Sequence, residues 1–170
     1  MNSPRVMTRP LLRGDRETFL QASRASRELH LPWIDPPVTT EEFDQYGDRF
    51  ESPAHVGRIV FLEESGELVG VINLNDIIRG YFQSAFLGFY AFLPHAGQGL
   101  MLEGLQLVIG EAFGPLGLHR LEANIQPPNQ RSLRLVQRAG FRKEGYSPSY
   151  LRVDGVWRDH ERWALVRETS

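Results

Sequence analysis

The order of apolar and polar positions along the chain predicts its strands. Alternation of apolar and polar residues is typical of a strand with one buried face, and a short continuous apolar run is typical of a strand buried on both faces. On this basis we expect strands at residues 6–12, at two places within 55–77, and at 84–93, 118–126, 144–153 and 156–166. Asp154-Gly155 joins the last two and is a strong hairpin signal, because both residues tolerate positive φ.

Helix signals lie between these strands. We expect helices at residues 15–30, within 39–50, at 98–113 and at 129–140. Asp15, Thr39 and Asn129 at three of the predicted starts and Gly at two of the predicted ends agree with these limits. The resulting order is strand, two helices, three strands, helix, strand, helix and two strands. Neighbouring antiparallel strands argue against a doubly wound sheet, so we predict a mixed α/β (α+β) fold.

Composition narrows the classes of protein to consider. The 170 residues suit one domain, 1–170, with a sizeable core. Lys and Arg number 19 and Asp and Glu 21, a formal charge of −2 that gives no reason to expect a nucleic-acid or membrane partner. The absence of cysteine excludes disulfides, thiolate metal sites and a catalytic cysteine. No apolar signal segment begins the chain, so we expect a cytoplasmic protein.

Two glycines separate the apolar strand 84–93 from the apolar helix 98–113. Gly97 and Gly99 lie where that helix begins, and a helix N-terminus with free N–H groups attracts phosphate. The same glycines are also common in an ordinary connection between a strand and a helix. Their spacing matches neither a dinucleotide fingerprint nor a P-loop, so on its own it leaves both interpretations open.

The strand that follows has one unusually polar face. Alternation places Leu121, Ala123 and Ile125 on one side and Arg120, Glu122, Asn124 and Gln126 on the other. A polar face inside a sheet is costly unless it borders a cleft or its groups are paired. Glu122 is therefore a candidate general base, with a structural ion pair to Arg120 or Arg138 as the alternative.

Further candidates lie in the loops and turns. Asn129 is predicted to cap the helix 129–140, and Ser132 in its first turn is a candidate donor to a leaving group. Trp33 lies in the proline-rich segment LPWIDPP and either lines a binding mouth or anchors a loop on the core. The five histidines contain no HExxH pattern, so we expect no metal site.

Taken together, the element order and three short motifs resemble the GNAT acyltransferase superfamily. The glycine-containing segment PHAGQG stands at the place of its acetyl-CoA signature. The C-terminal third, with its N-x-x-S, G-F-x-x-E-G-Y and D-G-x-W-R-D-H segments, is similar to the ribosomal-protein-alanine N-acetyltransferase (RimJ/RimL) branch. The resemblance covers nearly the whole chain. It implies a mostly antiparallel sheet of six or seven strands, splayed between the fourth and fifth strands and flanked by about four helices.

The resemblance also implies positions for the ligands. Pantetheine would enter between the splayed strands and pair with backbone around Phe92 and Leu93, and Asn129 would reach its arm near the thioester. The pyrophosphate would meet the amides of the loop, from Ala96 through Gly97, Gln98 and Gly99 to Leu100. The acceptor amine would arrive from the opposite side, through a mouth formed by the segment of Trp33 and the hairpin of Asp154.

We therefore expect a direct transfer of acetyl from acetyl-CoA to an amine, without a metal. Glu122 is the candidate base and Ser132 the candidate acid. The expected acceptor is the N-terminal α-amine of a protein such as a ribosomal protein. A small amine (polyamine, amino acid or antibiotic) and a non-catalytic CoA-binding module are the alternatives. The sequence leaves the oligomeric state open, and a homodimer is compatible with it.

Overall fold

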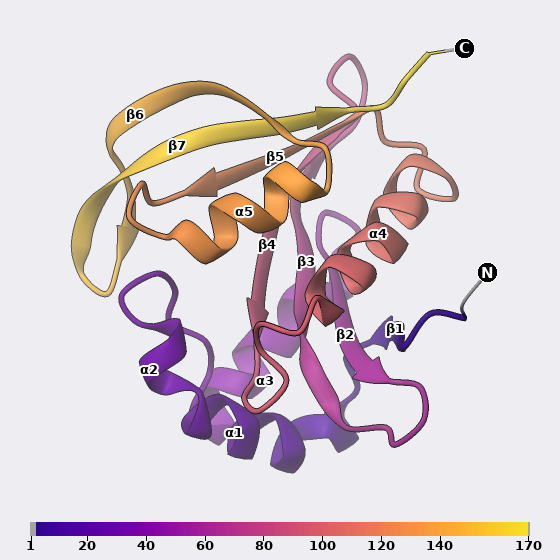
Figure 1. The fold of residues 1–170 in the computed structure, drawn as a ribbon, viewed down its shortest axis with the longest axis vertical. Helices are drawn as coiled ribbons and strands as arrows, with labels where there is room; N and C mark the ends of the chain where they lie inside the picture. The colour runs from indigo at the N-terminus through magenta and orange to yellow at the C-terminus, as the bar shows by residue number, and fades with distance from the viewer. Residues whose placement is uncertain (1–2, 170) are drawn as a thin grey trace.

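The computed structural model describes residues 3–169 and contains one twisted sheet of seven strands in the order β1-β2-β3-β4-β5-β7-β6 (Figure 1). The strands are β1 (Val6–Pro10), β2 (Val56–Leu62), β3 (Leu68–Ile78), β4 (Ser84–Ala91), β5 (Arg120–Ile125), β6 (Arg142–Val153) and β7 (Val156–Val166). All neighbouring pairs are antiparallel except β4 and β5, which are parallel. The mixed fold, with its splay between the fourth and fifth strands, is thus confirmed.

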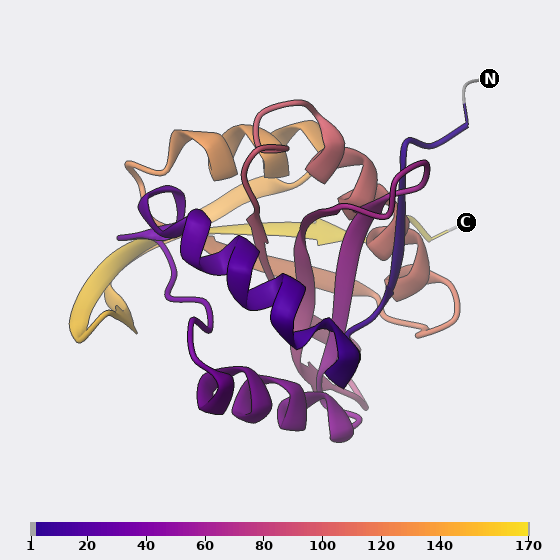
Figure 2. The ribbon, with the colours of Figure 1, turned by 90° about the horizontal axis from the view of Figure 1, so that it is seen from below.

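The helices lie on both faces of this sheet (Figure 2). They are α1 (Arg16–Ala25), α2 (Arg27–His30), α3 (Thr40–Asp48), α4 (Leu100–Phe113) and α5 (Gln130–Arg138), with 3-10 turns at Arg13–Asp15 and Arg49–Glu51. The large core cluster lies between the sheet and α4 and α5, and a smaller aromatic cluster lies between the sheet and α1 and α3. Among residues 3–169, no helix has the length and apolarity needed to cross a membrane.

Local sequence explains where the helices begin. The Thr39 hydroxyl accepts a hydrogen bond from the Glu42 N–H at 3.2 Å, and the Glu42 carboxylate accepts one from the Thr39 N–H at 3.2 Å. This reciprocal capping box satisfies amides that the first turn of α3 leaves free. Asn129 caps α5 by accepting from the Ser132 N–H at 3.3 Å, as the sequence predicts.

The expected continuous helix at residues 15–30 is divided into α1 and α2. Ser26 separates them with φ −105° and ψ 11°, and its N–H still bonds to the carbonyls of Ala22 and Ser23. Its side chain is fully buried and accepts a hydrogen bond from the Leu93 N–H at 2.9 Å. This contact spans 67 residues of chain, so no local pattern could reveal the break.

Candidate active site

The parallel pairing of β4 and β5 is short, and the strands separate after it. Only Ser84–Phe86 pair with Arg120–Glu122, although β4 continues to Ala91 and β5 to Ile125. In Figure 1 the β4 arrow runs downward and the β5 arrow runs to the left from their shared end. We call the unpaired part of the two strands the splay. Backbone groups that a neighbouring strand would otherwise bind are therefore available there.

The loop at the end of β4 leads directly into α4. Gly97 and Gly99 have φ of +80° and +78°, a region that side-chain-bearing residues rarely adopt. Gly99 is the N-cap of α4, whose first amides are free to bind an anion. Within the loop Ala96 is half-buried and Gln98 exposed, while Leu100 is buried in the core beneath it. The predicted positions thus form a turn whose backbone amides suit phosphate.

Arg5 is a charged neighbour of this loop that sequence reasoning missed. Its guanidinium Nη2 donates to the Gln98 carbonyl at 3.3 Å, and it pairs with Glu103 in the first turn of α4. The hydrogen bond from Arg5 lowers the pKa of the Glu103 carboxyl. Because 98 residues separate the partners, spacing along the chain gave no signal for this contact.

Phe92 and Leu93 directly follow β4, but their amides already have partners. The Phe92 side chain is fully buried, and its N–H donates to the Val69 carbonyl at 2.8 Å. The Leu93 N–H donates to Ser26 Oγ, while the Leu93 side chain is exposed. A cofactor arm can therefore reach neither N–H without displacing a protein group.

The polar face predicted for β5 is present. Leu121, Ala123 and Ile125 belong to the core cluster under α4 and α5, so Glu122 and Asn124 face the opposite side of the sheet. Gln126, which follows β5 on that polar side, is buried and donates from Nε2 to the carbonyls of Pro32 at 3.1 Å and Trp33 at 3.4 Å. These bonds tie the loop after α2 to the end of β5.

Glu122 makes the structural ion pair that the sequence left as an alternative. Arg120 Nε lies 2.9 Å from the Glu122 carboxylate, and Arg120 also binds Glu144 with two nitrogens. These hydrogen bonds raise the pKa of Arg120, with Glu144 as the largest contributor. Glu122 nevertheless keeps 34% of its side chain exposed and lies at the last paired position before the splay.

Ser132 and Asn129 lie together at the start of α5. Ser132 is half-buried in the first turn, and its N–H bonds the Asn129 side chain. The capping role of Asn129 is confirmed by this bond, whereas its predicted contact with the pantetheine arm and the role of Ser132 as acid stay predictions. In Figure 1 α5 crosses the region between the diverging ends of β4 and β5.

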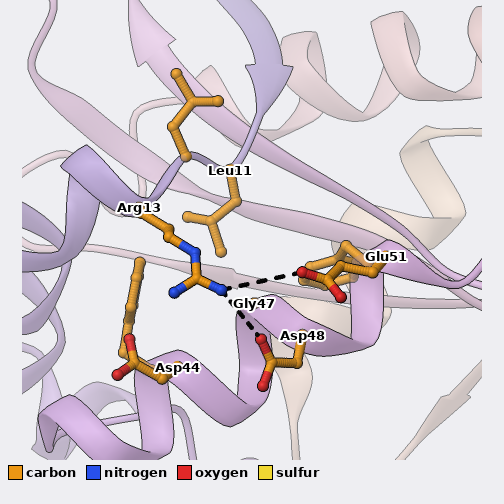
Figure 3. Close-up of a pocket in the computed structure, with 9 residues that line it drawn as sticks. Leu11, Arg13, Asp44, Gly47, Asp48 and Glu51 are labelled. Atoms are coloured by element: carbon orange, nitrogen blue, oxygen red, sulfur yellow. Dashed lines mark ion pairs between the residues drawn. The ribbon is translucent and has the colours of Figure 1, made fainter.

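The two residues predicted for the acceptor mouth lie in different segments. Trp33 is half-buried, and its segment is fixed by Gln126 and by hydrogen bonds to the His30 carbonyl. Asp154 is exposed at the tip of the β6–β7 hairpin with φ +49°. A separate surface pocket lies between the segment of Arg13 and α3, and there Arg13 pairs with Asp48 and Glu51 (Figure 3). None of the predicted site residues lines that pocket.

No cluster of three or more potential metal ligands occurs among residues 3–169. The groups that the structure places in this region are backbone amides at the splay and the loop, together with Glu122 and Ser132. Such a set can bind an anionic, amide-containing ligand and polarise a carbonyl group.

Comparison with known proteins agrees with this geometry. The family model described as an acetyltransferase (GNAT) domain matches residues 5–142. The [ribosomal protein uS5]-alanine N-acetyltransferase of Escherichia coli (strain K12) is 41% identical over 107 residues, 63% of this chain and 55% of that protein. The chain thus spans little more than half the length of this relative. The spermidine N(1)-acetyltransferase of Vibrio cholerae is 24% identical over 98% of this chain and 95% of its own length.

Solved structures share the fold. RimJ of Mycobacterium smegmatis in complex with CoA-disulfide has a TM-score of 0.87 and 25% identity, covering 95% of this chain and 81% of its own. The ribosomal-protein-S5-alanine acetyltransferase of Vibrio fischeri has a TM-score of 0.84 and 22% identity, covering 98% and 95%. On the family match, the motifs and the fold, the chain belongs to the GNAT acetyltransferase family.

Proposed function

We propose that this protein transfers acetyl from acetyl-CoA to an amine, and that its acceptor is the N-terminal α-amine of a protein. The observation that carries the proposal is the continuity of the splay with the glycine loop. The glycine turn at the start of α4 follows the strand β4, which has no β5 partner beyond Phe86. One extended ligand with a phosphate end and an amide-bearing arm would satisfy both features.

Two relatives support the choice of cofactor and acceptor. The RimJ structure contains CoA-disulfide, which holds the same pantetheine arm as acetyl-CoA. The Escherichia coli relative acts on the alanine of ribosomal protein uS5, as its name states. We extend the same type of acceptor to this chain. We further propose that residues 1–170 form one catalytic domain, because β7, which lies beyond the family match, pairs with β5 from Arg120 to Ile125. We propose a cytoplasmic location for this domain.

The reaction needs a free amine beside a polarised thioester. An α-amino group has a pKa of about 7.7–8.0, so much of it must lose a proton at neutral pH before attack. In our proposal Glu122 takes that proton through a water molecule, and Arg120 holds its carboxylate beside the splay. Holding the two reactants together can contribute up to about 7–11 kcal/mol in ideal cases.

We assign the remaining predicted residues their roles from where they lie around the splay and the glycine loop. The amides of residues 96–100 hold the pyrophosphate, and Asn129 meets the pantetheine arm. Ser132 donates a hydrogen bond to the CoA thiolate as it leaves. The loop of Trp33 and the hairpin tip at Asp154 border the path by which the acceptor arrives.

A polyamine acceptor is the second candidate, because the Vibrio cholerae relative acts on spermidine by its name. A polycation needs unpaired carboxylates along its path. Here Arg120 binds both Glu122 and Glu144, and Asp35 pairs with Arg27 at 3.3 Å. Asp154, which we also place on this path, is exposed and has no ion pair among the described residues. Pairing of the other three carboxylates favours an acceptor with a single charged amine.

The test is an intact-mass assay of the purified chain with acetyl-CoA. We expect a gain of one acetyl group on peptides that begin with Ala, and none on the same peptides with a blocked N-terminus. Acetylation of spermidine but not of the peptides would replace this proposal with the polyamine alternative. Binding of acetyl-CoA without turnover on any amine would support the non-catalytic module.

The base is tested by Glu122→Gln. We expect kcat to fall by about tenfold or more at pH 7, and by less at pH 9, where the acceptor amine is already neutral. The control is Glu17→Gln, which removes an exposed carboxylate from α1. A pH–rate profile that keeps the parent shape would remove Glu122 from this role.

A further inference from the structure

The backbone groups of β4 point alternately to its two neighbours. The Phe92 N–H donates to Val69 of the β3 side at 2.8 Å, so even-numbered amides face β3. The Gln83 carbonyl accepts from the His119 N–H at 2.7 Å and the Arg120 N–H at 3.2 Å, so odd-numbered carbonyls face β5. Beyond Phe86, the N–H and C=O groups of the odd-numbered residues therefore face the splay.

These groups form pairs that a parallel strand would use. In a parallel ladder, one residue of the neighbouring strand binds the C=O of residue i and the N–H of residue i+2. Three such pairs follow the last residues paired with β5. They are Leu87 C=O with Phe89 N–H, Phe89 C=O with Ala91 N–H, and Ala91 C=O with Leu93 N–H.

The third pair is already bound, and by side chains. His30 Nε2 lies 2.7 Å from the Ala91 carbonyl, and Leu93 N–H donates to Ser26 Oγ at 2.9 Å. Because a carbonyl only accepts, His30 Nε2 must carry the proton. Both side chains are buried, and the His30 ring packs edge-on against Tyr90 with centroids 5.3 Å apart. Ser26 and His30, which we call the latch, replace one residue of a parallel strand.

We propose that the latch fixes the register in which the acyl-pantetheine arm pairs with β4. This inference rests on the proposed function. The phosphate end lies in the loop after β4, so the arm runs back along β4 and its thioester lies farthest from the loop. With the third pair closed, the Phe89 N–H polarises the thioester carbonyl. The Phe89 carbonyl and the Ala91 N–H then bind amide groups of the arm.

The latch matters because a slip of the arm would misplace the reacting carbon. Moving one ladder position toward the loop shifts the arm by two residues, about 7 Å along the strand. The thioester would leave the Phe89 N–H and move away from Glu122. The arm therefore pairs two residues earlier than the Phe92 and Leu93 positions that the family resemblance implied, because the N–H groups of both residues have protein partners.

The first test follows single backbone amides by NMR hydrogen exchange in the full chain. We expect the Leu93 amide to be protected with and without acetyl-CoA, since Ser26 binds it in both states. Saturating acetyl-CoA should slow exchange of the Phe89 and Ala91 amides by about tenfold or more. Acetyl-CoA binding that leaves the Ala91 amide unchanged, or that alters Leu93 instead, would overturn the inference.

The second test removes the side chains that bind the third pair, in the variants Ser26→Ala and His30→Ala. We expect kcat to fall by about tenfold, with the Kd of CoA changed by less than about threefold, because the arm then occupies a mixture of registers. His30→Gln keeps an N–H donor and should recover most of kcat. The control is Ser23→Ala, which removes a buried hydroxyl of α1 that has no partner among the described residues.

Different results would refute the proposed function and the role of the latch. If acetyl-CoA produces no thermal shift in the parent protein, the proposed function is refuted and the role of the latch is refuted with it. If acetyl-CoA binds and is turned over, but the latch variants lower only the melting temperature and keep the parent kcat, Ser26 and His30 have a purely structural role. Parent-like kcat in the folded variants would therefore refute the latch alone.

Discussion

At the scale of single residues, backbone conformation determines much of the proposed cofactor site. Gly97 and Gly99 contribute no side chain, yet their positive φ angles set the turn that, in our proposal, presents amides to the cofactor. An added Cβ at Gly97 would meet no atom within 4 Å, so the requirement there is conformational rather than steric. The glycines were readable from the sequence, because the order of strand, glycines and helix indicated such a turn.

Gly99→Glu is expected to abolish stabilisation by acetyl-CoA. In the parent, ligand at about 100 times Kd adds roughly 2.7 kcal/mol to the free energy of unfolding. The new carboxylate lies at the N-cap of α4, where it obstructs and repels phosphate. The measurement is the shift in melting temperature on adding acetyl-CoA.

The matched control is Gly66→Glu, in the turn between β2 and β3. Gly66 has φ +76°, so the control variant carries the same type of backbone strain and the same added charge. It should retain the parent shift with acetyl-CoA. Equal loss of the shift in both variants would argue that strain or charge, rather than position in the loop, is responsible.

Other residues of the site could not be read from the sequence for a physical reason. His30, Ser26 and Arg5 act through partners 61, 67 and 98 positions away. Periodicity reports only which face of an element is buried, and it carries no information about a particular long-range hydrogen bond. For Glu122 the sequence offered an ion pair with Arg120 or Arg138 as one alternative, and the rotamers of the folded chain select Arg120.

At the scale of elements, the strands and the later helices follow their local signals closely. The expected helix at 98–113 is observed at Leu100–Phe113, and that at 129–140 at Gln130–Arg138. Each of these two helices begins directly after a cap residue that can be read from the sequence. The first helical segment differs because the Ser26 side chain accepts a hydrogen bond from the Leu93 N–H just after β4, and this tertiary bond overrides the continuous helical pattern.

The capping box of α3 gives a test at this scale. Thr39→Ala removes the acceptor for the Glu42 N–H and should lower the free energy of unfolding by about 1 kcal/mol. Thr40→Ala is the control, because Thr40 is an exposed residue inside the first turn and not the N-cap. Urea denaturation of the two variants and the parent measures the difference. Equal losses would contradict the assigned cap.

At the scale of the whole molecule, two buried histidines make stability depend on pH. Burial lowers the pKa of His30 and of His160 below the usual 6.5. Below pH 6.5 the unfolded chain binds protons that the folded chain does not, so the free energy of unfolding must decrease as pH falls. The carboxyls with lowered pKa, such as Glu103 and Glu144, start from 4.5 and titrate at still lower pH.

We therefore expect the protein to lose stability between pH 7 and pH 5. Denaturant unfolding at several pH values should show that His160→Gln has a shallower pH dependence than the parent. His119→Gln serves as the control, because His119 is exposed. A parent-like slope in His160→Gln would exclude that residue as a source of the effect.

The hydrogen bonds between Gln126 and the loop of Trp33 also have a consequence for synthesis of the chain. The segment after α2 leaves the ribosome about 94 residues before the glutamine that holds it. At a rate of about 5–20 residues per second, that interval is roughly 5–20 s. The loop of Trp33 is thus fixed only after β5 has been made. A nascent chain halted before this strand carries α1 and α2 without the contact that sets their loop.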